Sequence, residues 1–152
     1  MLVIPTDEHK SYSIAEIDSL NRDILNRPSE GDAKDSIKFL IFWSSRDNND
    51  KNGQMWCPDC VEMENSLIKV LEDLPARSTK ALSYVYVGQR DEWRSAENPF
   101  RKAPWNVERV PTILKIQPGH KISITDQISS PESRLVENEA IDVEKLSKFL
   151  SQ

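Results

Sequence analysis

Residues 54–63 read QMWCPDCVEM, and this stretch holds both cysteines of the chain. Cys57 and Cys60 are separated only by Pro58 and Asp59. A C-x-x-C pair can bind a metal, form a structural disulfide or exchange electrons with other disulfides. The segments on either side of the pair help to decide between these uses.

Apolar runs on both sides of the motif predict strands. Residues 37–43 (IKFLIFW) and 82–87 (LSYVYV) are almost continuously apolar, which is typical of central strands covered on both faces. Residues 111–116 (PTILKI) predict a third strand, and residues 122–125 (ISIT) predict a fourth. Residues 2–4 (LVI) are expected to form a short edge strand.

Three segments have helical periodicity. Residues 13–25 begin with Ser13 and Glu16, a capping-box pair. A second helix begins at Pro58, which suits a first helical position, and ends before Pro75. Residues 141–150 form the last helix. The side chains expected to face the core are Ile14, Ile17, Leu20, Ile24 and Leu25, then Cys60, Met63, Leu67, Leu71 and Leu74, and finally Val143, Leu146 and Leu150.

The remaining segments carry weaker patterns. Residues 88–110 have too little periodicity to be assigned, and residues 126–139, rich in acids and serine, are expected to be a loop. Neither a repeat nor a linker divides the chain, so residues 1–152 predict one domain. The order of strands and helices predicts an α/β fold with helices on both faces of the sheet.

Composition excludes several classes of function. The net charge is −5, whereas a general nucleic-acid binder normally carries a basic face. The apolar runs are too short to span a bilayer, and the N-terminus lacks the pattern of a signal peptide. We therefore expect a cytoplasmic protein that binds neither membrane nor nucleic acid. Cysteines in that compartment rarely form structural disulfides.

The three uses of the cysteine pair can now be compared. A closed zinc site needs about four ligands, and the other candidates, His9 and His120, are distant in sequence and lack a paired spacing. A disulfide between Cys57 and Cys60 would close so small a loop that it would stabilise little. A redox-active pair agrees best with a C-x-x-C that follows a buried strand and opens a helix.

A helix N-terminus explains how one thiol could react. Free N–H groups there favour a thiolate on Cys57 by about 0.3–1 kcal/mol, with Cys60 one turn deeper to meet it. Asp59 opposes this effect, since two charges ~6 Å apart repel by ~3 kcal/mol at a dielectric of ~20, before screening by solvent. Because these contributions oppose each other, the sequence does not decide how acidic Cys57 is. The alternative that Asp59 simply faces water also stays open.

The motif and its surroundings resemble one known family. WCPDC, the segment FWSSRDNNDKNGQMWCPDCV, the segment YVYVGQRDEWRSAENPFRK and the segment VERVPTILKI are similar to the family of the thioredoxin-related protein of about 14 kDa, also called the thioredoxin domain-containing protein 17 family. Classical thioredoxins have Trp-Cys-Gly-Pro-Cys instead. The resemblance covers residues 37–116, about half of the chain.

This resemblance implies a fold and an activity. The fold would be thioredoxin-like, with a central mixed β-sheet flanked by helices on both faces. The activity would be that of a protein-disulfide reductase acting on small-molecule, peptide or exposed protein disulfides such as cystine. Thioredoxin reductase would return electrons from NADPH, so that this chain binds no cofactor or metal itself, and we expect a monomer.

The resemblance also assigns residues. Cys57 would be the nucleophile and Cys60 the resolving thiol, while Pro58 and Asp59 would tune the redox potential. The peptide bond between Val110 and Pro111 would be cis and would face the sulfurs, with Val110 offering its backbone to an extended substrate. Trp56 is interpreted as a substrate contact, with packing against the sheet edge as the alternative. Trp93, Asn98, Phe100 and Arg101 match the family's segment after the second strand, and we expect them to pack structurally. Attraction of anionic substrates is an alternative for Arg101, Lys102 and Arg109, with scattered surface charge as the default interpretation.

Two features depart from the family pattern. Ordinary thioredoxins carry a buried Asp before the active site, where this chain has Ile41. Our hypothesis is that Asp59, or a water that it orders, deprotonates Cys60 instead. The chain is also longer than the family's usual size, mainly through residues 126–139.

A second function remains open at this point. The domain could be a redox-sensitive binding module that holds a partner protein with little turnover. A glutaredoxin-like enzyme is disfavoured, because Gly119 stands alone where glutaredoxins usually have two glycines.

Overall fold

β2 (Lys38–Trp43) is the central strand of a five-stranded mixed sheet. A computed structural model describes residues 10–25, 37–46, 54–74, 82–117 and 123–151. The strand order is β1-β3-β2-β4-β5. β1 (Lys10–Tyr12) and β3 (Leu82–Tyr86) run parallel to β2, whereas β4 (Thr112–Ile116) pairs with it antiparallel, and β5 (Arg134–Val136) pairs antiparallel with β4.

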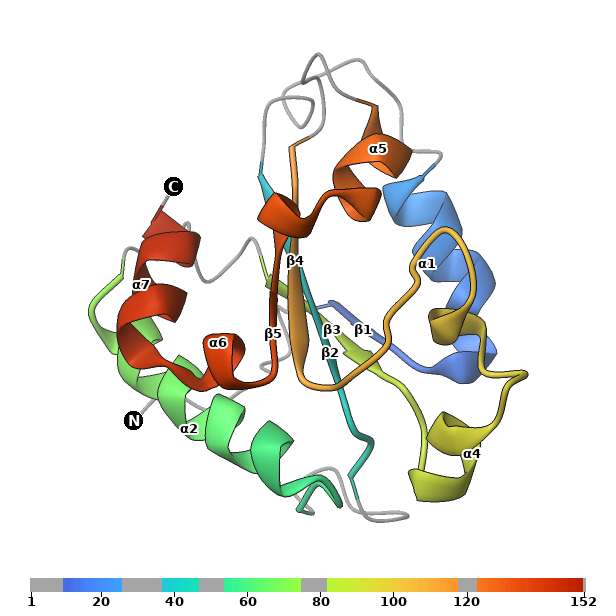
Figure 1. The fold of residues 1–152 in the computed structure, drawn as a ribbon, viewed down its shortest axis with the longest axis horizontal. Helices are drawn as coiled ribbons and strands as arrows, with labels where there is room; N and C mark the ends of the chain where they lie inside the picture. The colour runs from blue at the N-terminus through green and yellow to red at the C-terminus, as the bar shows by residue number, and fades with distance from the viewer. Residues whose placement is uncertain (1–9, 26–36, 47–53, 75–81, 118–122, 152) are drawn as a thin grey trace.

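Helices cover both faces of this sheet (Figure 1). One layer contains α2 (Pro58–Glu72), α6 (Asn138–Ile141) and α7 (Val143–Ser151), and the other contains α1 (Ile17–Ile24), α4 (Arg90–Arg94) and α5 (Ile124–Ser129). The predicted α/β arrangement is confirmed.

Alternating side chains of β2 join the two layers. Phe39 packs against Phe149 of α7, with ring centroids 5.8 Å apart. Phe42 points to the other face, where it lies 6.0 Å from Phe100 and 5.9 Å from Trp105. Both faces of the strand are therefore buried, which explains its continuous apolar sequence.

The first predicted helix is present as two consecutive pieces. Residues Ile14–Glu16 form a short 3-10 helix, η1, which leads into α1. The predicted capping box is confirmed, because the backbone N–H of Ser13 donates to Glu16 Oε1 at 3.2 Å and the two residues satisfy each other's free groups.

The unassigned connection, residues 88–110, is ordered by one buried amide. It contains α4 and a 3-10 helix, η3 (Pro99–Arg101). The Asn98 amide nitrogen donates to the carbonyl oxygens of Val87 at 2.8 Å and Glu92 at 3.1 Å, and its oxygen accepts the N–H of Phe100 at 3.0 Å. The connection thus owes its shape to side-chain hydrogen bonds, which leave no periodic signal in a sequence.

The prediction of a strand at residues 122–125 is wrong. Residues Ile124–Ser129 form α5, and the Ser123 hydroxyl caps it by accepting the N–H of Asp126 at 3.2 Å. Gln127 of this helix then bonds both backbone groups of Gln117, at 2.7 and 3.0 Å, just beyond the end of β4. A side-chain amide therefore replaces the expected partner strand at that point.

The prediction that residues 126–139 form a loop is also wrong. This segment contains most of α5, a 3-10 helix η4 (Pro131–Ser133), the edge strand β5 and the start of α6. β5 has only three residues, and its register with β4 rather than its own composition defines it.

Two further predictions concern the last helix and the first strand of the chain. Val143 is 43 % exposed instead of facing the core, and Phe149 takes that place beside Leu146 and Leu150. The predicted strand at residues 2–4 lies outside the described residues, and the first described strand is β1.

We predict that Asn98→Asp destabilises the protein by about 2–4 kcal/mol, because a carboxylate would face two carbonyl oxygens in a site that is only 3 % exposed. Urea unfolding would measure the change. Asn138→Asp is the matched control, since Asn138 is exposed at the first position of α6 and its replacement should change stability by less than about 0.5 kcal/mol. Equal effects of the two substitutions would contradict this role of Asn98.

Candidate active site

The start of α2 carries the two cysteines, and Ser44, directly after β2, donates its backbone N–H to Cys60 Sγ. Cys57 is the N-cap of α2, and its carbonyl accepts the N–H groups of Cys60 and Val61, both at 3.1 Å. Pro58 occupies the first turn, where the N–H that it lacks would have had no helical partner. This local geometry places Cys60 one turn into the helix, as predicted.

The two thiols differ in access to solvent. Both cysteines are free. Cys57 is 9 % exposed, which is less open than we expected of the nucleophile, and Cys60 is 0 % exposed. Cys57 is therefore the cysteine that an external disulfide can reach, and Cys60 is enclosed by protein.

Cys57 is the more acidic thiol. A hydrogen bond from Cys60, together with backbone N–H groups at the start of α2, outweighs burial and lowers the pKa of Cys57 to about 7. The carboxylate of Asp59 raises this pKa, while the Asp59 N–H lowers it. The opposing effects seen in the sequence are both present, and the sum favours a thiolate near neutral pH.

Cys60 stays protonated because it is deeply buried. Burial raises its pKa far above the usual range, and the neighbouring Cys57 raises it further. The opposing influences come from Ser44, whose backbone N–H donates to Cys60 Sγ at 3.4 Å and whose hydroxyl also lowers the pKa of Cys60. A protonated Cys60 can serve as the donor that keeps Cys57 ionised.

The predicted cis peptide faces the sulfurs. The bond between Val110 and Pro111 is cis, and the Val110 carbonyl oxygen lies 3.9 Å from Cys57 Sγ. On the other side of this turn, the Pro111 carbonyl accepts the N–H of Glu137 at 2.8 Å. A second cis bond, between Ala103 and Pro104, was not predicted.

Trp56 is anchored at the rim of the site. Its indole N–H donates to the Gly88 carbonyl at 2.9 Å, and the Arg90 guanidinium lies 5.1 Å from its ring centroid. Gly88 has φ +105°, and a Cβ there would come within 2.7 Å of Ile14. The indole is half-buried and packed against the core, so the packing alternative is present, and its contact with substrate stays a prediction.

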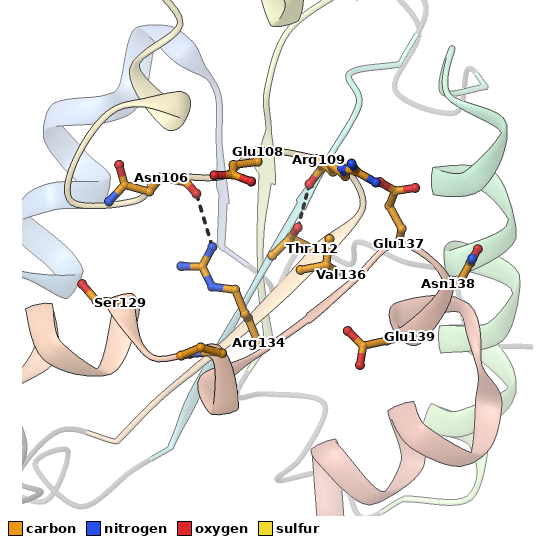
Figure 2. Close-up of a pocket in the computed structure, with 11 residues that line it drawn as sticks. Asn106, Glu108, Arg109, Thr112, Ser129, Arg134, Val136, Glu137, Asn138 and Glu139 are labelled. Atoms are coloured by element: carbon orange, nitrogen blue, oxygen red, sulfur yellow. Dashed lines mark hydrogen bonds and ion pairs between the residues drawn. The ribbon is translucent and has the colours of Figure 1, made fainter.

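A cavity of about 720 Å³ lies beside the cis-proline turn rather than at the cysteines (Figure 2). Arg109 forms an ion pair with Glu137 at 3.1 Å on the wall of this cavity. The Thr112 hydroxyl donates to the Arg109 carbonyl at 2.7 Å. Arg134 is held by the carbonyl oxygens of Trp105, Asn106 and Ile128, at 3.2, 3.4 and 2.5 Å. These contacts brace the turn that carries Val110.

The other candidate residues pack in the protein or form ion pairs at its surface. Trp93, Asn98 and Phe100 are buried as predicted, and Arg101 stacks on Trp93 with its guanidinium 4.1 Å from the ring centroid. Lys102 forms an exposed ion pair with Glu97 at 3.2 Å. Sequence reasoning missed Ser44, Gly88 and Glu137; the +49° φ of Glu137 has no sequence signal.

Neither a metal-binding cluster nor a membrane-spanning helix occurs among the described residues. Within them, no cluster of three or more His, Cys, Asp or Glu residues could hold a metal ion. His9 and His120 lie outside the described residues. No helix in the described part of the chain combines the length and apolarity needed to cross a membrane.

Comparisons with known proteins agree with this geometry. The sequence model of the family described as thioredoxin domain-containing protein 17-like, thioredoxin domain, matches residues 17–139. Thioredoxin-like protein Clot from Arabidopsis thaliana is 32% identical over 98 residues, covering 64% of this chain and 70% of that protein. Thioredoxin domain-containing protein 17 from Homo sapiens is 33% identical over 84 residues, covering 55% of this chain and 63% of that protein.

A solved structure supports the fold. Thioredoxin O2 from Arabidopsis thaliana, in its oxidized state, superposes with a TM-score of 0.51 at 13% identity, over 97% of this chain and 98% of that one. At such low identity the likeness shows a thioredoxin-like fold and no more. The family match and the neighbouring Cys57 and Cys60 together mark the chain as a thiol oxidoreductase.

We predict that alkylation of Cys57 by iodoacetamide rises with pH and levels off above a midpoint near 7, the pKa of Cys57, because only the thiolate reacts. Cys60→Ala removes the hydrogen bond that lowers this pKa most, so the midpoint should move to higher pH. The rate at pH 7 should fall about fourfold, the loss of thiolate being partly offset by its greater nucleophilicity. Mass spectrometry of the alkylated peptide measures both rates. An unchanged midpoint in Cys60→Ala would contradict the assigned cause.

Proposed function

The chain belongs to the thioredoxin domain-containing protein 17-like family of thioredoxin domains, and from this premise we propose that it is a disulfide reductase. Its substrates would be small-molecule, peptide or exposed protein disulfides. The observation that carries the proposal is the unequal thiol pair, an acidic and slightly exposed Cys57 in front of a protonated and buried Cys60.

The narrow access to Cys57 supports this substrate class. Attack on a disulfide requires the sulfur nucleophile to approach along the axis of the S–S bond. A nucleophile that is 9 % exposed can do so only if the disulfide protrudes or belongs to a slender molecule. Cystine and peptide disulfides meet this condition, and disulfides embedded in a folded surface do not.

The cis-proline turn would hold the substrate beside the nucleophile. The Val110 carbonyl lies 3.9 Å from Cys57 Sγ, so a segment paired with this backbone would place its disulfide at the sulfur. The Arg90 guanidinium lies 5.1 Å from the Trp56 ring centroid, and we expect the ring to contact the substrate and the guanidinium to attract its carboxylates.

The reaction transfers two electrons in two displacements. The Cys57 thiolate attacks one substrate sulfur, forming a mixed disulfide and releasing the first thiol. Cys60 then attacks Cys57 Sγ, which breaks the mixed disulfide and releases the second thiol. The chain is left with a Cys57–Cys60 disulfide, and a thioredoxin reductase would restore the dithiol with electrons from NADPH. This recycling fits a monomer that works in the cytoplasm.

Asp59 acts on the acidity of Cys57 through its charge. Its carboxylate raises the pKa of Cys57, so removing the charge should lower this pKa. We expect Asp59→Asn to speed the first displacement about twofold below pH 7, the size expected of one solvent-screened charge. Stopped-flow kinetics against pH would test this, and a midpoint that moves to higher pH would show that the carboxylate supports the thiolate.

A coupled assay tests the proposed activity. With NADPH and thioredoxin reductase, the protein should consume NADPH when cystine is added, and Cys57→Ser should reduce the rate to that of the reductase alone. Cys60→Ser should instead accumulate a mixed disulfide that mass spectrometry detects. Thermal unfolding of Cys57→Ser and Cys60→Ser shows whether either variant has lost stability.

The same assay separates the reductase from the rival binding module. A binding module would hold its partner in a redox-dependent way without sustained NADPH consumption. Absence of turnover with cystine, with peptide disulfides and with unfolded protein disulfides would therefore refute the proposed function.

A further inference from the structure

Ser44 contacts both cysteines of the pair. It follows β2 directly and is 0 % exposed. Its backbone N–H donates to Cys60 Sγ at 3.4 Å, and its hydroxyl oxygen accepts the backbone N–H of Cys57 at 3.3 Å. Because an oxygen that accepts one hydrogen bond keeps its own hydrogen, the hydroxyl can donate at the same time. The hydroxyl also lowers the pKa of Cys60, so it favours the same thiolate that the Ser44 N–H contacts.

The second displacement needs such donors. Cys60 must carry negative charge as it attacks, yet burial strongly disfavours a thiolate there. On the strand, the position that could hold a buried carboxylate is occupied by Ile41, which is 0 % exposed. Fixed donors aimed at a developing charge are the usual means of stabilising it in a water-poor site.

The charged groups around the pair act elsewhere. Asp59 influences Cys57, and Arg46, which pairs with Glu64 further along α2, influences Tyr86. Cys57 is the titratable neighbour that affects Cys60, and it opposes ionisation of Cys60 while it is itself a thiolate. Once Cys57 is part of a mixed disulfide it carries no charge, and this opposition ends.

We propose that Ser44 is a catalytic residue of the second displacement, in which its N–H and hydroxyl stabilise the thiolate of Cys60 as it attacks Cys57. This inference rests on the proposed dithiol mechanism. Cys60 Sγ forms a bond to Cys57 Sγ while the bond from Cys57 to the substrate sulfur breaks. The substrate sulfur leaves with the electron pair and takes up the proton that Cys60 loses, so that Ser44 ends the step unchanged.

A chromogenic aryl disulfide, dithiobis(nitrobenzoate), separates the two displacements in one stopped-flow trace. The first coloured thiolate is released when Cys57 attacks, and the second when Cys60 resolves the mixed disulfide. Cys60→Ser should show the first phase alone. If the wild-type protein also shows no second phase, the proposed dithiol function fails, and this failure is distinct from a failure of the role of Ser44.

Ser44→Ala keeps the backbone N–H and removes the hydroxyl. We expect the second phase to slow about tenfold at pH 7, because the hydroxyl that favours the Cys60 thiolate is lost, while the first phase changes less than about twofold. The pH midpoint of the second phase should move to higher pH. Ser44→Thr, which retains a hydroxyl, should restore most of the rate.

Ser66→Ala is the matched control for structural damage. Ser66 is also a buried serine, and its hydroxyl donates to the Ile141 carbonyl at 2.6 Å, away from the sulfurs. Loss of this bond should leave both phases and the pH midpoint unchanged, and thermal unfolding of both variants shows how much stability each has lost.

Two results would overturn the inference. The second phase of Ser44→Ala could be unchanged, or both phases could slow in parallel without a change in the pH midpoint. Asp59→Asn provides the comparison with our earlier hypothesis: if it slows the second phase and Ser44→Ala does not, Asp59 has the role assigned to Ser44.

Discussion

The burial of β2 on both faces is the constraint on which the active site depends. Phe39 and Phe42 attach this strand to the two helical layers, so its last residue has little freedom. The chain leaves the sheet at Ser44, and the backbone N–H there meets the sulfur of Cys60 from α2. The position of the reactive pair relative to the sheet is therefore set by packing along the whole strand rather than by the motif alone.

The two cysteines have opposite protonation preferences because they occupy different depths of the same helix turn. Cys57 is at the N-cap, where backbone N–H groups and a little solvent favour the thiolate. Cys60 is enclosed, and burial favours the thiol. These preferences support each other, since a protonated Cys60 can donate a hydrogen bond to an ionised Cys57. Cys57 depends on this pairing most, because the hydrogen bond from Cys60 is the largest influence that lowers its pKa.

Sequence reasoning predicted the parts of the fold that are held by local periodicity. β2, β3, β4, α2 and the first helix all have apolar patterns that match their burial. It failed for β5, which is a strand because of its pairing with β4, and for α5, where a serine cap and Gln127 replaced the expected alternation. Val143 shows the same difficulty on a smaller scale, because rotation of a short helix decides which apolar side chain is covered.

The candidate site was predictable to the extent that its residues form a motif. The residues WCPDC identified the cysteines, and the cis bond before Pro111 came from resemblance, because nothing in the local sequence distinguishes it from a trans bond. Ser44 could not be found in this way. A serine after a strand is unremarkable in sequence, and its importance comes from the approach of Cys57, the N-cap of α2, thirteen residues further along the chain. Residues 47–53 of that connection lie outside the described structure.

Replacement of a buried carboxylate by neutral donors changes the order of events at the pair. A carboxylate beside Cys60 would accept its proton, but it would also repel a thiolate on Cys57 in the resting protein. The N–H and hydroxyl of Ser44 carry no net charge, so they leave the resting Cys57 thiolate unopposed. Their stabilising effect becomes large only when Cys60 acquires charge, and this happens after Cys57 has been neutralised by bonding to the substrate. A site built in this way favours capture of a disulfide first and its resolution second, and the only titrating groups that it requires are the two sulfurs themselves.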